Sequence, residues 1–469
     1  MHREGLYLIC PMWLLWHLRL YADKKYFTLA RQKDIVCIYV FVREHKALTC
    51  IINENYWKMK LFAQYKGLKR ENYILFFGRI VTNLGAMIWP LMTMILNKKL
   101  GLNATDTAMF SIISGIFFLP ANLLGGRIAD KFNKKKVIIC CDIISIILFV
   151  TSGFIPLSLF SMCVLLAGAF FQTLEGPAYQ AMVADITPQD KREKAFSLLY
   201  LGGNIGLIIS PIVAGLLFNN YLWLCFVISG ISISISTILI GIFVKDIGVS
   251  DTNEQDVEQD GSEGINIWKI IRNSTTLILF IIALSFYQGA YSQFSYLMPL
   301  DITKAYPENG SIIYGTITSV NCIIVVLFTP IITMAMEKVT MTKKYTLGII
   351  FQALSFLAFL LSFGVIAGYY ASITLFTVGE ILTTIVIGAY LSERVPANFR
   401  GRIYGVTNFA AAFMSGVVEW GSGRLFDDYG LKYAWAFSIG MTMVAVIASC
   451  VLIYTDRKEF SNLYAEVKE

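Results

Sequence analysis

Residues 126–136 read GRIADKFNKKK and place five cations and one acid within eleven positions. The 469-residue chain around them is apolar, with 56% hydrophobic and only 15% charged residues. Apolar runs of about 20 residues flank this stretch, and each is long enough to cross a bilayer as a helix. Most of these runs lack a polar face, which a soluble core helix would need. The composition therefore predicts an all-α integral membrane protein that crosses the lipid bilayer many times.

The apolar runs predict twelve transmembrane helices. Their approximate ranges are 73–96, 107–125, 137–155, 160–184, 195–218, 221–244, 275–298, 312–336, 345–365, 369–392, 403–423 and 433–454. The widest gap begins with an acidic, polar stretch free of Lys and Arg, a composition typical of flexible linkers. We predict an N-terminal six-helix bundle at 59–245, a cytoplasmic linker at 246–274, a C-terminal six-helix bundle at 275–456 and a cytoplasmic tail at 457–469.

The positions of Lys and Arg predict the orientation in the membrane. If the first helix begins in the cytoplasm, the inner loops and tails hold 24 Lys and Arg and the outer loops hold 5. Cytoplasmic loops of membrane proteins carry such an excess. We therefore expect a plasma-membrane protein with both termini in the cytoplasm.

Residues 1–58 do not fit this pattern. They contain all three histidines of the chain, and their apolar run at 6–16 is too short to span a bilayer. We expect this segment to be an atypical extension that is not part of the native protein, which would then begin near Met59.

Two halves of the chain share short sequences at a constant spacing. DITPQDKR at 185–192 and ERVPANFR at 393–400 repeat an acid, a proline and an arginine at a displacement of 208 residues. GLLF at 215–218 and GRLF at 423–426 repeat at the same displacement. This predicts a duplicated six-helix unit, an architecture common among transporters. The repeated loop charges, which we take as candidate functional residues, are Asp185, Arg192, Glu393 and Arg400.

The opening stretch resembles the signature G-x-x-x-D-[RK]-x-G-[RK]-[RK] of the major facilitator superfamily. GPAYQAMVADITPQDKREKAFSL and NFRGRIYGV are similar to the fourth-to-fifth and tenth-to-eleventh connections of its drug-exporter-like branch, the drug:proton antiporters. The resemblance covers about residues 60–456. It implies two six-helix bundles that rock between inward-open and outward-open states.

The resemblance assigns roles within 126–136. Gly126 would let neighbouring helices approach closely. Asp130 would accept from the positive amino end of the eleventh helix and latch the cytoplasmic face shut in the outward-open state. Asn133 stands where the family prefers Gly, so we expect a tight turn with positive φ there. The cations that would hold the loop inside are Lys131, Lys134 and Lys135.

The antiporter signature of the fifth helix, G-x-x-x-G-P-x-x-G-G, is present in weakened form. The chain keeps Gly206, Pro211 and Gly215 but has small residues in place of two other glycines. The arginine that many proton-coupled exporters carry in the fourth helix has no match in 165–179. The identity of the coupling ion, proton or sodium, is therefore left open by the sequence.

Glu380 and Glu175 fall inside predicted helices, where charge is costly and usually functional. Glu380 lies near the middle of the tenth helix and Glu175 lies in the fourth. The resemblance places the first, fourth, seventh and tenth helices around a central cavity. A carboxyl group there would hold either a proton or a cationic substrate, which is the simplest rule for exchange.

Other polar and aromatic residues in these helices are candidates for the substrate cavity. Aromatic rings mixed with amides suit an apolar or mildly polar ligand. The candidates are Asn83, Trp89, Gln172, Tyr287, Gln288, Tyr291, Asn321 and Asn408.

We therefore predict a secondary transporter, most simply a multidrug-type exporter of hydrophobic or cationic small molecules driven by protons. One alternative is a proton symporter that imports a sugar, peptide or other metabolite. Another is a membrane sensor or scaffold that does not transport. No G-x-x-x-x-G-K-[ST] loop is present, and the nine cysteines lack metal-site spacing. We expect no enzymatic activity, cofactor, metal or nucleic-acid partner, and a monomer.

Overall fold

The computed structural model describes residues 65–188, 191–245, 271–362, 364–395 and 399–465, and the backbone of 27–32, 35–40 and 48–52. The predicted linker lies mostly outside these residues. The chain forms two compact units, Met1–Leu68 and Lys69–Glu469. The first contains an antiparallel sheet of strands β1 (Phe27–Gln32), β2 (Ile35–Val40) and β3 (Leu48–Ile52), in that order.

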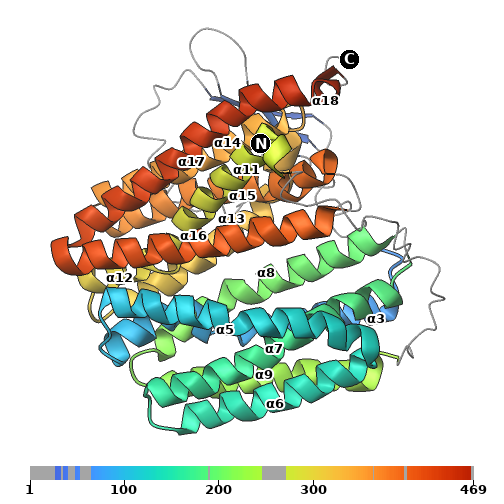
Figure 1. The fold of residues 1–469 in the computed structure, drawn as a ribbon, viewed down its shortest axis with the longest axis vertical. Helices are drawn as coiled ribbons and strands as arrows, with labels where there is room; N and C mark the ends of the chain where they lie inside the picture. Colours follow the sequence, from blue (N-terminus) through green and yellow to red (C-terminus); the bar gives the residue numbers. More distant parts are fainter. Residues whose placement is uncertain are drawn as a thin grey trace, which may run out of the picture. The chain divides into compact units, whose positions relative to one another are not determined.

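The second unit is helical and has two halves (Figure 1). The N-terminal half contains α3 (Arg70–Leu84), α4 (Ile88–Met94), the π-helix η1 (Ile95–Lys99), α5 (Ala104–Lys131), α6 (Lys134–Phe154), α7 (Leu159–Ile186), α8 (Arg192–Leu217) and α9 (Leu222–Phe243). The C-terminal half contains α11 (Thr275–Tyr291), the 3₁₀ turn η3 (Ser292–Phe294), α12 (Leu297–Ala305), α13 (Gly310–Ala335), α14 (Met341–Leu361), α15 (Ile366–Arg394), α16 (Arg400–Tyr429), α17 (Leu431–Glu459) and α18 (Asn462–Ala465).

Within the described part of the chain, eleven helical segments are long and apolar enough to cross a membrane. They correspond to every predicted span except 403–423. That segment belongs to α16, which is 30 residues long and carries charged residues in its first and last turns. With α16 included, the architecture agrees with the predicted pair of six-helix bundles.

The same packing pattern occurs in each half. In the N-terminal half α3 packs on α8 and α9, α6 packs on α7 and α9, and α5 packs on α7. In the C-terminal half α11 packs on α16 and α17, α14 packs on α15 and α17, and α13 packs on α15. These contacts of the N-terminal half are thus repeated in the C-terminal half by the helices that hold the corresponding places in the chain, as expected of a duplicated unit.

Two spans differ from the predicted continuous helices. The first is interrupted between Leu84 and Ile88. Gly85, at the interruption, lies so close to Ser232 and to the backbone of Ser229 that a larger side chain would not fit. The seventh span turns at η3 and continues as α12 to Ala305, beyond its predicted end at 298. Asp301 therefore lies inside α12, where it is buried and accepts from the Tyr369 hydroxyl and the Trp435 indole.

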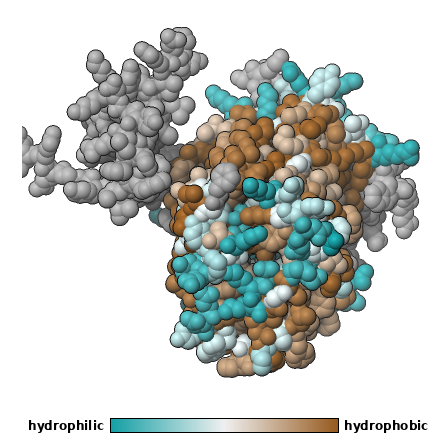
Figure 2. All heavy atoms as spheres, turned by 90° about the vertical axis from the view of Figure 1, so that its left-hand side faces the viewer, coloured by the Kyte–Doolittle hydropathy of each residue, from teal (hydrophilic) through white to brown (hydrophobic). Residues whose placement is uncertain are grey.

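The halves meet through α8 against α13 and α5 against α16. We call the end that carries 97–104, 219–221, 305–310 and 427–431 the outer end, following the charge-based prediction, and the opposite end the inner end. The hydrogen bonds that join the two halves between described residues lie at the outer end. Figure 2 looks onto this end and shows hydrophilic residues over much of the face, with hydrophobic residues toward its margins.

Small residues allow this contact between the halves. A Cβ atom added at Gly215 would lie 2.5 Å from the carbonyl oxygen of Ser311, so α8 and α13 could not approach as they do. The Ser311 hydroxyl donates to the Gly215 carbonyl at 3.0 Å across the same contact. Gly206, another predicted residue of the fifth helix, packs against the backbone of Ile80 in α3.

The expected positive φ at Asn133 was wrong. Its φ is −59°, and its side chain accepts from the backbone N–H of Lys136 at 3.0 Å. Asn133 is therefore the N-cap of α6. A short polar side chain is preferred to Gly at this position because it accepts a hydrogen bond from the first turn of the helix. The loop between α5 and α6 turns in extended conformation, and needs no left-handed residue.

Candidate functional site

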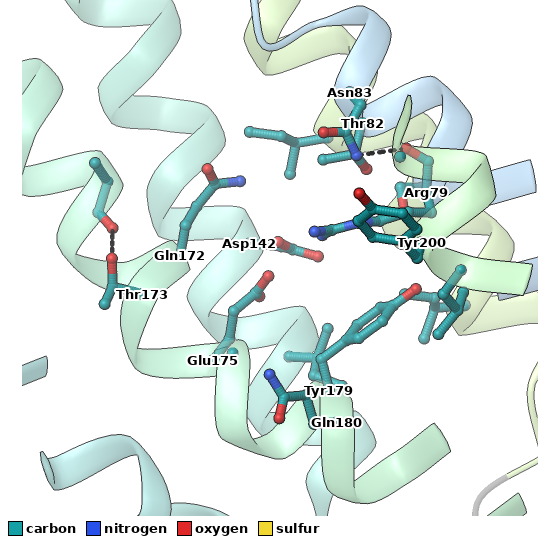
Figure 3. Close-up of a pocket in the computed structure, with 18 of the residues that line it drawn as sticks. Arg79, Thr82, Asn83, Asp142, Gln172, Thr173, Glu175, Tyr179, Gln180 and Tyr200 are labelled. Atoms are coloured by element: carbon teal, nitrogen blue, oxygen red, sulfur yellow. Dashed lines mark hydrogen bonds between the residues drawn. The ribbon is translucent and has the colours of Figure 1, made fainter. Parts of the chain in front are cut away.

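A cavity of about 760 Å³ lies among helices of the N-terminal half. Its walls come from α3 to α9 and combine charged, amide and aromatic side chains (Figure 3). The polar lining residues are Arg79, Thr82, Asn83, Asp142, Gln172, Thr173, Glu175, Gln180, Asn204 and Ser236. The aromatic ones are Trp89, Phe118, Tyr179, Phe196 and Tyr200. Such a mixture can enclose an apolar molecule and still compensate a charge on it.

Two carboxyl groups meet in this cavity. Asp142 of α6 and Glu175 of α7 point toward one another (Figure 3). Asp142 is only 4% exposed, and it accepts from the Thr237 hydroxyl of α9 at 2.6 Å. Oε2 of Glu175 is buried and has no hydrogen-bond partner within the described part of the chain. One acid is therefore fixed by a neighbouring helix, while the other has an oxygen available for a proton or a ligand.

A single cation faces these acids across the cavity. The guanidinium of Arg79 extends from α3 to the side of Asp142 opposite Glu175 (Figure 3). One turn further along the same helix, the Asn83 side chain donates to the Arg79 carbonyl at 2.9 Å. Two acids and one guanidinium give these three groups a net charge of −1 when all are ionised, so a cation or a proton would be attracted to them.

Three of the predicted cavity residues line this cavity, namely Asn83, Trp89 and Gln172, as does the predicted acid Glu175. The others lie elsewhere. Tyr287 and Asn321 are buried in the C-terminal half, and Tyr291 lies partly buried beside them. Gln288 is partly buried in α11, and Asn408 is exposed on α16.

Glu380 belongs to a separate hydrogen-bonded group in the C-terminal half. Its Oε1 accepts from the Tyr291 hydroxyl at 2.8 Å, and its Oε2 accepts from the Asn321 amide at 2.7 Å. The same amide donates to Thr377 at 2.9 Å. Both oxygens of Glu380 are therefore occupied, in contrast to Glu175. Tyr200, which lines the cavity, lies within electrostatic range of Glu380.

The two polar groups occupy equivalent positions in the duplicated halves. At the displacement of 208 residues, Gln172 corresponds to Glu380 and Glu175 corresponds to Thr383. Arg79 and Asn83 likewise correspond to Tyr287 and Tyr291. In the C-terminal half the Tyr287 hydroxyl lies 2.5 Å from the Thr383 hydroxyl. Each half therefore carries a carboxyl group on the equivalent helix, α7 or α15. The two positions differ by one helical turn when the halves are aligned.

Sequence analysis missed Asp142, although a signal was present. It is the one charged residue of the apolar run VIICCDIISII within the predicted third span. An acid in such a run is a functional candidate whichever helix carries it. The family resemblance points to the first, fourth, seventh and tenth helices, whereas Asp142 lies in the third.

The remaining predicted residues cluster at the inner end. Lys134 forms an ion pair with Asp185, and Lys135 donates to the carbonyls of Gly241 and Val244 at 2.8 and 2.7 Å, at the end of α9. These two lysines therefore connect α6 to α7 and α9 in addition to carrying charge. Arg192 donates to the Ala184 carbonyl, and Glu393 pairs with Arg394. The side chains of Asp130 and Arg400 lie outside the described residues.

No described group of three or more His, Cys, Asp or Glu side chains is arranged to hold a metal ion. The carboxyl pair with its arginine is therefore the main chemical feature of the cavity. It can bind and release protons or hold a positively charged ligand, and its helices contact both the cavity and the rest of the N-terminal bundle.

Comparison with known families gives one match along most of the helical unit. The model of the Major Facilitator Superfamily matches residues 75–419. A Na(+), Li(+), K(+)/H(+) antiporter of Planococcus maritimus is 22% identical over 406 residues, covering 78% of this chain and 89% of that protein. The quinolone resistance protein NorA of Staphylococcus aureus is 26% identical over 251 residues, covering 52% of this chain and 62% of that protein.

Solved structures share the fold at low sequence identity. A POT family transporter in complex with 5-aminolevulinic acid superposes with a TM-score of 0.68 at 15% identity, covering 84% of this chain and 97% of that one. A bacterial homologue of the human lysosomal transporter Spinster superposes with a TM-score of 0.60 at 14% identity, covering 83% and 98%. These likenesses concern the fold alone.

Proposed function

The chain belongs to the major facilitator superfamily of membrane transporters, and from that premise we propose that it exports hydrophobic or cationic small molecules in exchange for protons. The observation that carries this proposal is the cavity of about 760 Å³ that combines aromatic walls with the Asp142–Glu175 pair. The likeness to a quinolone resistance protein supports the same class of substrate. We propose a location in the plasma membrane with both termini cytoplasmic.

The exchange step follows from competition at the carboxyl pair. A cationic substrate that enters the cavity lies beside Asp142 and Glu175 and displaces the proton that they hold. After the bundles rock, a proton from the other side displaces the substrate. Because one site cannot hold both, outward movement of substrate is tied to inward movement of protons.

Glu380 has a different role in this proposal. Its two oxygens are engaged by Tyr291 and Asn321, so it must lose a hydrogen bond before it binds a ligand. We propose that it senses the state of the cavity through Tyr200, which lines the cavity and interacts electrostatically with Glu380. Glu175 is then the first site of exchange and Glu380 the second.

A second candidate function is exchange of protons for a monovalent metal cation. Carboxylate and amide oxygens, which Asp142, Glu175 and Gln172 supply, are ligands for hard cations. The Planococcus relative, named as an antiporter of Na(+), Li(+) and K(+), favours this candidate. Proton symport that imports a metabolite is the alternative in which the substrate moves in the opposite direction. The likeness to peptide transporters does not favour it, because at 15% identity it concerns the fold alone.

Everted membrane vesicles with an acidic interior separate these functions. An exporter driven by protons takes up a fluorescent cationic dye such as ethidium, and the interior becomes more alkaline as protons leave. Uptake of sodium with the same alkalinisation, but no dye uptake, would support the metal-cation candidate. Movement of a metabolite outward together with protons would overturn export in favour of symport, and no flux of any kind would support a sensor or scaffold.

The role of Arg79 can be tested by neutralising it. In an Arg79→Gln variant the cavity gains one unit of net negative charge, and we expect ethidium to bind about tenfold more tightly, as a charge some 10 Å away predicts at an effective dielectric constant of about 20. A neutral dye of similar size should change less than twofold. Equilibrium dye binding by fluorescence anisotropy measures both. The control is Arg272→Gln, because Arg272 is exposed and does not line the cavity; weaker ethidium binding in Arg79→Gln would show that the guanidinium contributes to the site instead of opposing the substrate.

A further inference from the structure

The amino end of α5 and the carboxyl end of α16 are joined at the outer end. Oδ1 of Asp427 accepts from the backbone N–H of Ala104 at 3.1 Å. Its Oδ2 accepts from the backbone N–H of Thr105 at 2.8 Å and from the Thr105 hydroxyl at 2.6 Å. These bonds cross between the two halves of the transporter, because α5 belongs to the N-terminal half and α16 to the C-terminal half.

The contact completes the cap of α5. The first N–H groups of a helix have no partner within the helix, and they attract a negative charge. The side chain of Asn103, the N-cap residue, accepts from the N–H of Asp106. Asp427 satisfies the N–H groups of Ala104 and Thr105, which would otherwise turn to water. The cap of α5 therefore depends on a residue of the opposite half.

Two neighbouring residues hold the helices in this position. The Tyr296 hydroxyl donates to the carbonyl of Ala104, which is the first residue of α5. A Cβ atom added at Gly423 would come within 3.1 Å of the Ala104 carbonyl carbon, so the absent side chain lets α16 approach the end of α5. The contact is thus built from both a small residue and a directed set of hydrogen bonds.

The inner ends of the same two helices look different. A Cβ atom added at Gly126 of α5 or at Gly405 of α16 would meet nothing within 4 Å. The two helices run antiparallel, since α5 begins at the outer end and α16 begins at the inner end. Each carries an aspartate near its carboxyl end, Asp130 in α5 and Asp427 in α16. In this state the outer pair of helix ends is joined and the inner glycines are uncovered.

We propose that Asp427 is the latch of the outer end, which holds the transporter in its inward-open state and releases the amino end of α5 when the outer end opens. The Asp427 cap is then made in the inward-open state and is lost in the outward-open state. The inference rests on alternation between the two states and is independent of the substrate.

Removal of the latch shifts the population of states. In Asp427→Ala the hydrogen bonds and the charge are lost, and we expect the ratio of outward-open to inward-open molecules to rise about tenfold. In Asp427→Asn one acceptor oxygen remains but the charge is lost, so we expect a smaller rise. Asp427→Glu restores the charge, and its ratio should lie closest to that of the unmodified protein.

Distances between spin labels at Pro156 and Lys432 measure this ratio, because both residues are exposed at the outer end and lie in opposite halves. The measurement uses the full chain in lipid nanodiscs, with the nine native cysteines replaced. The matched control is Asp428→Asn, since Asp428 pairs with Arg424 of its own helix at 2.7 Å. Its distance distribution should equal that of the unmodified protein.

Two results would overturn the latch. One is an unchanged distance distribution in Asp427→Ala, and the other is an equal shift in Asp428→Asn. If Asp427→Ala fails to fold, Thr105→Val removes only the hydroxyl donor and should shift the ratio in the same direction by a smaller factor; no shift there would also reject the latch. The labels report conformation without substrate, so a failure of the export proposal leaves this measurement unaffected.

Discussion

Replacing Glu175 with Gln is expected to lower proton-driven uptake of dye into everted vesicles by roughly 100-fold, the scale on which a positioned proton-transfer group acts. The amide has nearly the same size as the carboxyl group but cannot exchange a proton. Oε2 of Glu175 is buried and lacks a hydrogen-bond partner within the described residues, and the amide of Gln can still pair with the neighbouring Asp142 carboxylate by donating to it. Exchange of dye for dye, which needs no net proton movement, should stay within about threefold of the unmodified protein.

Parallel variants separate the two acids. Glu380→Gln should lower proton-driven uptake by a smaller factor, because both oxygens of Glu380 are already engaged, and the amide can accept from Asn321 and donate to the Tyr291 hydroxyl. Glu337→Gln is the control, since Glu337 is exposed at the inner end, outside both polar groups. If proton-driven uptake by Glu175→Gln equals that of the control, Glu175 has no part in coupling.

The twelve helices could be predicted because each is an apolar run bounded by charge. The division into halves could also be predicted, since repeated sequences at a displacement of 208 residues survive in the loops. The end of the seventh span was predicted too early, at 298, whereas α12 continues to Ala305. Asp301 can lie inside this helix because it is paired with Tyr369 and Trp435, which lie far along the chain and are not indicated by any local pattern.

The candidate site could be predicted only in part, for a physical reason. Spacing along a helix tells which residues share a face, but it does not tell toward which neighbour that face turns. Glu175 and Glu380 were both expected at one cavity, yet the rotation of α15 brings Glu380 to Tyr291 and Asn321. The contact between Asp427 and α5 was equally hidden, because it joins helix ends more than 300 residues apart.

The inner end of the C-terminal half contains a buried ion pair that no short motif indicates. Asp456 of α17 is 0% exposed, and its side chain accepts from Nε and Nη2 of Arg394 in α15 at 2.6 and 2.8 Å. The hydroxyl of Tyr390 donates to Oδ1 at 2.8 Å, and that of Tyr464 donates to Oδ2. One carboxylate thus connects α15, α17 and the short helix α18 at the point where these helices end.

Replacing Asp456 with Asn is expected to destabilise the protein by about 3–5 kcal/mol, because it leaves the buried Arg394 guanidinium without its counter-charge. Unfolding in detergent, followed by the reaction of buried cysteines with a thiol dye, measures the change. The control is Asp428→Asn, which breaks a pair with the same chemistry whose side chains are 61% and 39% exposed. Water screens that pair, so its loss should cost less than about 1 kcal/mol. Equal losses in the two variants would mean that water reaches Arg394, and the three helices would then be held together by apolar packing instead of by this ion pair.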